Sequence, residues 1–201
     1  MGGDLIARYN IAPGTHPWIV RAGSPQGLSF ETYLWGLVPF WSKDPKTGVR
    51  PINAKAETAH EKPMFRKLLR ERRCLVPADC FYEWKATPGG KVPYCIRMAS
   101  HEPFFFAGLW DVWHEGQADA LPSFTILTTE PNELTATIHN RMPVIVRAAD
   151  YTRWLDLGER EPKNVADVLS PFPAEEMISY PVRTLVNNVK HEGPELIVPV
   201  S

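Results

Sequence analysis

The chain has 201 residues, of which 44% are hydrophobic and 22% charged, and its formal net charge is −1 at pH 7. This length is typical of one domain, and the hydrophobic fraction is sufficient for a continuous core. Proteins that coat duplex DNA non-specifically carry a surplus of basic residues. This balance argues against that class, so any nucleic-acid site must be a local patch.

Cysteine usage and apolar runs indicate the compartment. Cys74, Cys80 and Cys95 form no C-x-x-C pair, and an odd number without a leader peptide is typical of a reduced, intracellular protein. No stretch approaches 18 apolar residues, and the first residues lack the charged and apolar regions of a signal peptide. We therefore expect a cytoplasmic protein with no membrane partner.

Strands outnumber helices among the elements that the sequence predicts. No β-α-β alternation with a Gly-rich phosphate loop is present, so we expect a single α+β domain, residues 1–201, with a mostly antiparallel sheet or barrel-like core and flanking helices. In chain order, we expect a strand at 32–38, a loop at 41–51 and a helix at 54–73 that is split by Pro63. Two short strands at 73–84 and further strands at 93–98, 104–113 and 124–129 should follow. We then expect helices at 131–139 (capped by Asn132) and 148–157 (with Asp150 as a possible cap), a polar connection around a short helix at 159–173, and short strands at 179–200.

Three polar residues lie in otherwise apolar surroundings. Asn53 follows a loop and precedes the predicted helix, where capping the helix is the simpler interpretation. Glu83 lies in the strand sequence Phe-Tyr-Glu-Trp, where desolvation by aromatic neighbours would raise its pKa toward values useful for acid–base chemistry, unless it faces solvent. His139 precedes a proline that ends regular structure, a common location for a site residue. No further His, Cys or Asp lies near it at ligand spacing, so no metal and no other cofactor is expected.

Cys80 and Trp41 are the other candidates for chemistry or binding. Side chains alternate along a strand, so Cys80 and Glu83 should face opposite sides, and we interpret Cys80 as a small buried residue like the other cysteines. Trp41 lies in a loop rich in proline and glycine, near Lys43 and Lys55. An exposed aromatic ring beside cations could stack on a base and contact phosphates, or the ring could anchor the loop against the sheet.

Four segments, in this order and spacing, resemble the SRAP (SOS response-associated peptidase) family of abasic-site processing proteins. The similarity extends over nearly the whole chain, and the closing segment 186–190 (Val-Asn-Asn-Val-Lys) also resembles the end of the family's sequence. The four segments are 8–13 (Arg-Tyr-Asn-Ile-Ala-Pro), 35–58 (from Trp-Gly-Leu-Val-Pro to Ile-Asn-Ala-Lys-Ala-Glu-Thr), 77–85 (Pro-Ala-Asp-Cys-Phe-Tyr-Glu-Trp-Lys) and 138–143 (Ile-His-Asn-Arg-Met-Pro).

The resemblance implies a compact α+β domain that binds single-stranded DNA near duplex junctions and recognises the open aldehyde form of an abasic site. In this family an amino-terminal cysteine, exposed by removal of the initiator Met, closes a thiazolidine ring on that aldehyde. By match, Asn53 would hold the amino-terminal residue, Glu83 would position and deprotonate the amine or shuttle protons, and His139 would assist ring opening and imine formation. Trp41, Lys55 and Arg141 match positions expected at the DNA, although Arg is common where Lys55 stands, and Lys lacks its planar fork.

The sequence departs from the family at its start. Family members begin Met-Cys-Gly-Arg, a few tens of residues before the Arg-Tyr-Asn segment, whereas here residues 1–7 lead directly into Arg8. The cysteine and its strand are therefore expected to be missing, either because the chain is shortened or because it is a degenerate homologue. The joint presence of Asn53, Glu83 and His139 favours a missing segment.

The family resemblance leaves three functions open. The first is an enzyme-like repair protein that acts on abasic sites at damaged DNA in the nucleoid, with this chain inactive as given because it lacks the nucleophilic cysteine. The second is a module that binds single-stranded DNA without covalent chemistry. The third, ranked last because no Cys-His protease pairing is present, is a peptidase that uses Glu83 and His139.

Overall fold

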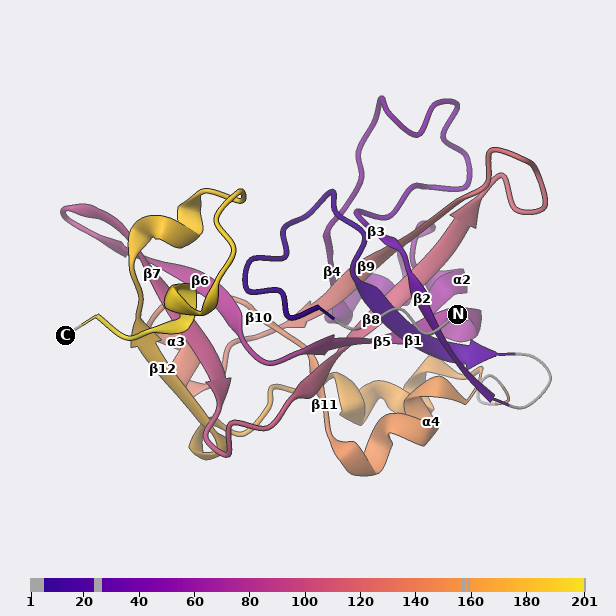
Figure 1. Cartoon of the computed structure of the whole chain (residues 1–201). Coiled ribbons are helices and arrows are strands. Elements are labelled where there is room, and N and C mark those ends of the chain that lie inside the picture. The colour runs from indigo at the N-terminus through magenta and orange to yellow at the C-terminus, as the bar shows by residue number, and fades with distance from the viewer. Residues whose placement is uncertain (1–5, 24–26, 157, 159, 201) are drawn as a thin grey trace.

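The computed structural model of this chain describes residues 6–23, 27–156, 158 and 160–200 (Figure 1). The first five residues, which belong to the segment where the sequence departs from the SRAP pattern, lie outside the described residues. Within the described part no helix is long and apolar enough to cross a membrane.

The described residues form two sheets that stand side by side (Figure 1). The larger, nine-stranded sheet follows the order β10-β9-β8-β5-β1-β2, with β3 and β4 on β9 and β11 on β8, and the smaller sheet follows the order β12-β7-β6. The strands of the larger sheet are mostly antiparallel, but β3 and β4 run parallel to β9. The strands are β1 (Trp18–Gly23), β2 (Gly27–Thr32), β3 (Leu34–Trp35), β4 (Asn53–Lys55), β5 (Arg73–Ala78), β6 (Phe81–Thr87), β7 (Gly90–Met98), β8 (Phe104–Trp113), β9 (Leu121–Thr129), β10 (Met142–Pro143), β11 (Ile145–Val146) and β12 (Met177–Pro181).

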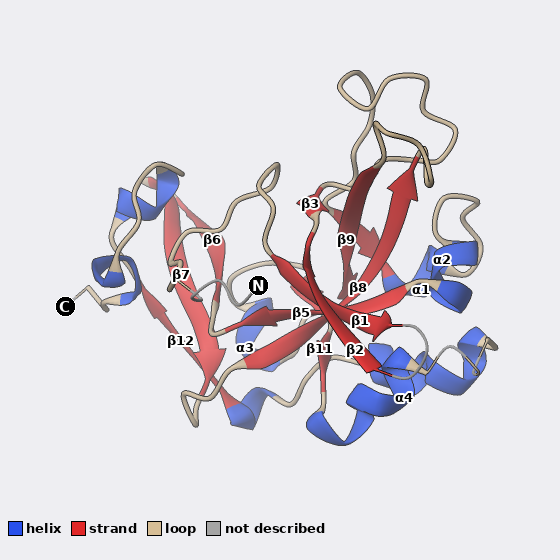
Figure 2. Cartoon of the chain, turned by 45° about the vertical axis from the view of Figure 1, so that its right-hand side comes forward, coloured by secondary structure: helices blue, strands red, loops and turns tan. Residues whose placement is uncertain are grey.

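Short helices connect these strands (Figure 2), and those at residues 56–59, 66–71 and 151–155 pack against one face of the larger sheet. The α-helices are α1 (Ala56–Ala59), α2 (Arg66–Glu71), α3 (Glu133–Ala136) and α4 (Tyr151–Leu155), and the 3₁₀ helices are η1 (Ala148–Asp150), η2 (Pro162–Leu169), η3 (Ala174–Glu176), η4 (Thr184–Asn187) and η5 (Pro194–Ile197). The α+β class with a mostly antiparallel, curled sheet is confirmed.

Alternation along the strands divides the core into two layers. On β5, Leu75 packs with the helices α1, α2 and α4, whereas its neighbours Cys74 and Val76 pack on the other face with residues of the smaller sheet. On β9, Leu127 likewise packs on the face covered by helices, and Ile126 packs on the opposite face. One face of the large sheet is thus closed by helices, and the opposite face meets the smaller sheet.

A buried arginine fastens two helices to the sheet. Arg73 is fully buried at the start of β5, and its guanidinium donates to Leu69 O (3.0 Å), Trp154 O (2.6 Å) and Asp156 O. These carbonyls lie at the ends of α2 and α4, where helices leave backbone acceptors unpaired. The Trp154 indole in turn donates to Cys74 O (2.8 Å).

Several local predictions are confirmed, and others are wrong. Pro63 does separate two helices, and Asn132 does cap α3, accepting from Thr135 N at 2.9 Å. The predicted helix at 54–73, however, begins only at Ala56, because residues 54 and 55 belong to β4, and it ends before residue 73, which belongs to β5. The predicted strand at 32–38 is reduced to β3 because the chain turns at Gly36 (φ +136°). Asp150 makes no capping bond and instead pairs with Arg153.

Replacing the buried arginine should destabilise the whole fold. We expect Arg73→Met to lower the free energy of unfolding by about 3 kcal/mol, because hydrogen bonds from a charged donor contribute about 1.5–3 kcal/mol and the carbonyls would stay buried. Urea unfolding measures this. Arg66→Met, on the exposed side of α2, should change stability by less than about 0.5 kcal/mol, and equal stabilities of the two variants would contradict the role given to Arg73.

Candidate functional site

Strand β9 has partners on both edges, and these partners carry several of the predicted site residues. Ile126 is paired with Asn53 of β4 on one edge and with Gly108 of β8 on the other. Two residues later Thr128 is paired with Lys55 and with Pro143 of β10. Segments that are far apart in sequence, around residues 53 and 142, therefore flank the same end of one strand.

Asn53 and Lys55 point toward the face that meets the smaller sheet. Ala54 between them is buried against the helices, so its two neighbours face the other way, and both are exposed. The capping interpretation of Asn53 is wrong, because α1 begins at Ala56 with Lys55 at the N-cap position. The Asn53 side chain is thus an exposed amide on a strand.

Glu83, in the smaller sheet, lies close to His139, which belongs to the segment between α3 and β10. Glu83 lies in the middle of β6, and His139 follows α3, where its backbone N–H donates to Thr135 O at 2.9 Å. The distance from His139 Nδ1 to Glu83 Oε2 is 3.9 Å. The same Nδ1 lies 3.1 Å from Arg141 O and 3.2 Å from Arg141 N, so its hydrogen-bond role is set by the tautomer.

Burial raises the pKa of the Glu83 carboxyl above its ordinary value of 4.5, and the opposing influences of His139, the Trp84 N–H and Lys91 are smaller. The solvent-facing alternative for Glu83 does not hold, since its side chain is 24% exposed. A carboxyl that holds its proton to higher pH than usual beside an imidazole is suited to give and take protons.

Arg141 is held by a carboxylate and by the end of β9. Its guanidinium donates to Glu57 through two bonds of 2.7 and 2.8 Å and to Thr128 O at 2.6 Å. The Arg141 bond lowers the pKa of Glu57, and the charge of Lys55 acts in the same direction. The sequence did not single out Glu57, which lies only two residues from Lys55.

Trp41 lies apart from this group, in the loop between β3 and β4. Its ring is 50% exposed and meets Phe40, which is 66% exposed, edge-on with centroids 4.8 Å apart. The loop rises above the sheet (Figure 1), and it also carries exposed Lys43, Lys46 and Arg50. The interpretation of Trp41 as a residue tucked against the sheet is wrong.

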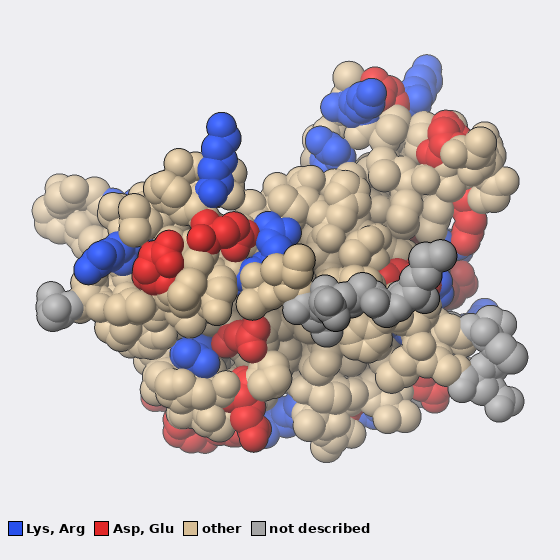
Figure 3. Space-filling view, in the orientation of Figure 1, with Lys and Arg blue, Asp and Glu red and all other residues tan. Residues whose placement is uncertain are grey.

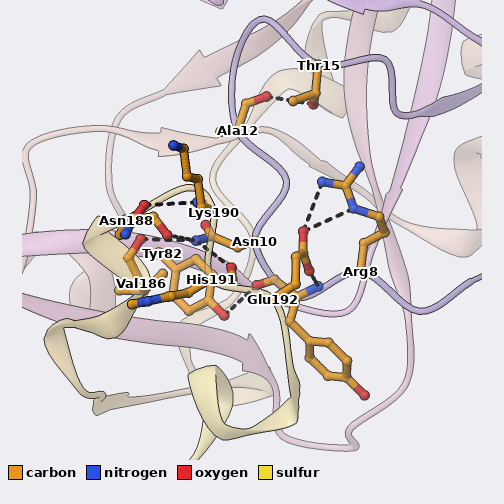
Figure 4. A network of polar contacts seen from close by, with 11 residues as sticks. Arg8, Asn10, Ala12, Thr15, Tyr82, Val186, Asn188, Lys190, His191 and Glu192 are labelled. Atoms are coloured by element: carbon orange, nitrogen blue, oxygen red, sulfur yellow. Dashed lines mark hydrogen bonds and ion pairs between the residues drawn. The ribbon is translucent and has the colours of Figure 1, made fainter.

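The first described residues are fastened to the last part of the chain (Figure 4). Arg8 Nε and Nη2 donate to one oxygen of Glu192 at 3.0 and 2.9 Å, and Tyr9 N donates to the other at 2.8 Å. The buried Asn10 amide donates to three carbonyls of that region, and the Tyr82 hydroxyl donates to Tyr9 O at 2.8 Å. These segments cover one side of β6.

Cys80, directly before β6, and Glu83, within it, point to opposite sides of the strand, as predicted. Cys80, Tyr82 and Trp84 pack in one cluster beneath the chain ends, whereas Glu83 faces His139. A hydrogen bond to Cys95 and burial both raise the pKa of the Cys80 thiol, which keeps it a poor nucleophile. In the part of the chain that the structure describes, no three His, Cys, Asp or Glu side chains are grouped to hold a metal ion.

Comparisons with known proteins agree on one family. The family profile described as SOS response associated peptidase (SRAP) matches residues 2–189. The abasic site processing protein YoqW of Bacillus subtilis is 43% identical over 197 residues, which cover 97% of this chain and 87% of that protein. The abasic site processing protein YedK of Escherichia coli is 32% identical over 199 residues, covering 98% and 86%. A crystal structure of a protein from Bacteroides thetaiotaomicron superimposes with a TM-score of 0.84 at 28% identity, over 94% of this chain and 82% of that one.

The raised pKa of Glu83 predicts how stability depends on pH. Such a carboxyl contributes stability below its unfolded pKa, near 4.5, and this contribution is lost as the pH rises through the folded pKa. Glu83→Gln removes the titration, so we expect the melting temperature of the variant to exceed that of the parent at pH 7. The difference should vanish toward pH 4.

Glu57 provides a control of opposite sign. Its pKa is lowered, so the stability it contributes is present above its unfolded pKa and is lost as the pH falls. Glu57→Gln should therefore lower the melting temperature at pH 7 and have less effect in acid. If both variants shifted in the same direction across the pH range, the assignment of Glu83 as the desolvated carboxyl would be wrong.

Proposed function

The chain belongs to the SRAP family, and on this premise we propose that it processes abasic sites in single-stranded DNA. The observation that supports this most strongly is the approach of Glu83 to His139 at 3.9 Å, beside the backbone of Arg141. The side chain of the same residue reaches the end of β9, where its guanidinium donates to Thr128 O. A proton-transfer pair whose own segment also carries a cation suits a reaction on a sugar that is flanked by phosphates.

The proposed reaction begins with the closed sugar. His139 moves a proton between the ring oxygen and the C1′ hydroxyl, which opens the hemiacetal to the aldehyde. A neutral amine then adds to the aldehyde carbon, and a proton passes from the resulting ammonium to the alkoxide, which gives a carbinolamine. The protonated Glu83 carboxyl gives its proton to the carbinolamine hydroxyl, which leaves as water. The iminium that remains returns a proton to Glu83 and becomes the imine, so amine plus aldehyde gives imine plus water.

Asn53 would orient the incoming amine. Its exposed amide lies on β4, on the face directed toward the smaller sheet, and it carries both donors and an acceptor. Glu57 and Arg141 close that end of β9 by their ion pair. We propose that Asn53 binds the amino-terminal residue while Glu83 and His139 act on the sugar.

DNA would be held by a local patch, in keeping with a net charge of −1. In Figure 3, Lys and Arg atoms gather on the loop that rises above the sheet and carries Trp41, and no continuous basic surface covers this face. Trp41 would stack on a base, and Lys55 and Arg141 would contact phosphates. Because Glu57 occupies two donors of Arg141, a phosphate must share or displace that carboxylate.

Non-covalent binding of single-stranded DNA is the alternative function. The exposed pair Phe40 and Trp41 favours it, because base stacking needs no nucleophile. Covalent chemistry and binding can be separated by their products, since only the first leaves protein attached to the abasic sugar.

The nature of the product tests the covalent proposal. A chain whose first residue is Met1 or Gly2 offers an α-amine, with an ordinary pKa of about 7.7–8.0, but no thiol on the same residue. It can form an imine but not a thiazolidine. We expect no heat-stable adduct with an abasic oligonucleotide, but an adduct that borohydride traps, detected by denaturing electrophoresis.

The trapped adduct should decrease strongly in Glu83→Gln and disappear when the amino terminus is acetylated. Adding the family's Met-Cys-Gly-Arg segment with the residues that follow it should restore a heat-stable adduct. A heat-stable adduct of the unmodified chain would refute this assignment and point to Cys80.

DNA binding should depend on Trp41 and Arg141. Stacking contributes about 1–3 kcal/mol per base, so Trp41→Ala should weaken binding of single-stranded DNA about tenfold, since 1.4 kcal/mol corresponds to one decade. Arg141→Ala should make the plot of log K against log salt shallower by about 0.7 if one phosphate contact is lost. Fluorescence anisotropy at several salt concentrations measures both.

Two variants serve as controls for these binding measurements. Phe30→Ala removes an exposed ring on β2, the far edge strand of the sheet, and should leave affinity unchanged. Glu57→Gln releases the Arg141 guanidinium and should tighten binding. Unchanged curves for both Trp41→Ala and Arg141→Ala would refute the proposed DNA surface.

A further inference from the structure

The loop that carries Trp41 is held at two points by buried or half-buried indoles. Trp113, at the end of β8, donates its Nε1–H to Ser42 O at 2.7 Å, one residue after Trp41. Trp35, in β3, donates its Nε1–H to Ile52 O at 3.0 Å, one residue before Asn53. The two anchors therefore adjoin the two residues to which the proposed function assigns stacking and amine binding.

Trp113 itself belongs to a small, separate core. It is 5% exposed and packs with Leu34 and Val38, and with Leu121, its partner across the β8–β9 hairpin. The turn end of that hairpin thus supplies a rigid donor to the loop. A loop bond to such a fixed group restricts the loop more than a bond within the loop could.

The segment next to the anchor is a tight turn. Ser42 N donates to Pro39 O at 2.9 Å, so Phe40 and Trp41 occupy the two central positions of the turn. Beyond it, Asp44 accepts from Lys46 N at 2.8 Å and from Thr47 Oγ1 at 3.2 Å. These bonds shape the loop internally. The Trp113 bond ties the far end of the turn, at Ser42, to the sheet, and just before the turn Val38 N donates to Ser123 Oγ of β9 at 2.9 Å.

We propose that Trp113 is a positioning residue for DNA binding, which fixes the turn of Phe40 and Trp41 at a set place relative to Asn53. The proposal rests on the stacking role given to Trp41. Ordering the turn before DNA arrives removes part of the entropy cost of binding. The indole N–H of Trp113, and not only its apolar ring, is the group that performs this task.

The test compares two buried tryptophans. Trp113→Phe keeps an aromatic ring in the core but removes the donor to Ser42 O. Trp154→Phe is the matched control, because it removes an indole bond of similar length, 2.8 Å to Cys74 O, from the helix-covered face. A hydrogen bond contributes about 0.5–1.5 kcal/mol, so Trp113→Phe should weaken binding of a labelled oligothymidine about two- to tenfold.

A double-mutant cycle separates positioning from general destabilisation. In a Trp41→Ala background, Trp113→Phe should cause no further loss of affinity, because the ring that it positions is gone. Trp154→Phe should leave affinity unchanged in both backgrounds. A Trp113→Phe protein that binds like the parent, or a loss that persists fully without Trp41, would overturn the proposal.

Hydrogen exchange distinguishes failure of this inference from failure of the DNA proposal. Trp113→Phe should accelerate exchange of the backbone amides of residues 40–44, 46 and 47, whereas Trp154→Phe should not. Suppose that Trp113→Phe speeds exchange in this loop but Trp41→Ala leaves the affinity for DNA unchanged. Trp113 would then order the turn, but the turn would not bind DNA, and both the stacking role of Trp41 and the positioning role of Trp113 would be overturned. Unchanged exchange would overturn the anchor alone.

Discussion

The pairing of β9 on both edges is the constraint on which the arrangement of the site depends. A strand between two neighbours is fixed in register along its whole length, because a shift by one residue would turn every side chain to the other face. Here the register sets Asn53 against Ile126 and Lys55 against Thr128, while β10 brings the segment after Arg141 to the same Thr128. The bond from Arg141 to Thr128 O then fixes the cation at the end of the strand.

Two carboxyl groups of this region have opposite environments. Glu57 lies at the surface against a guanidinium, which lowers its pKa, whereas burial raises the pKa of Glu83 although His139 is near. Glu57 is therefore suited to hold Arg141 by charge, and Glu83 is suited to exchange a proton. The difference arises from solvent exposure and from the distance to the nearest cation, since the two side chains are chemically identical.

The sequence predicted the features that have a local cause. The α+β class, the break at Pro63, the Asn132 cap and the opposite orientation of Cys80 and Glu83 all follow from patterns within a few residues. The strand β4 was missed because Asn-Ala-Lys has no β-branched or aromatic residue, and it forms a strand because a parallel edge of β9 is free to pair with it. The contact of Glu83 with His139 was expected from the family resemblance, whereas the bonds of Arg141 to Glu57 and of Arg8 to Glu192 join distant segments and leave no periodic signal.

The bonds that join Arg8, Tyr9 and Asn10 to residues 186–192 have a consequence for biosynthesis. Arg8 is translated first, and its partner Glu192 is made 184 residues later. At about 5–20 residues per second this interval is roughly 10 to 40 s. The side of β6 that these segments cover therefore stays open until residues 186–192 have been made, and the buried cluster of Cys95, Val186 and Leu196 beneath them is completed only then.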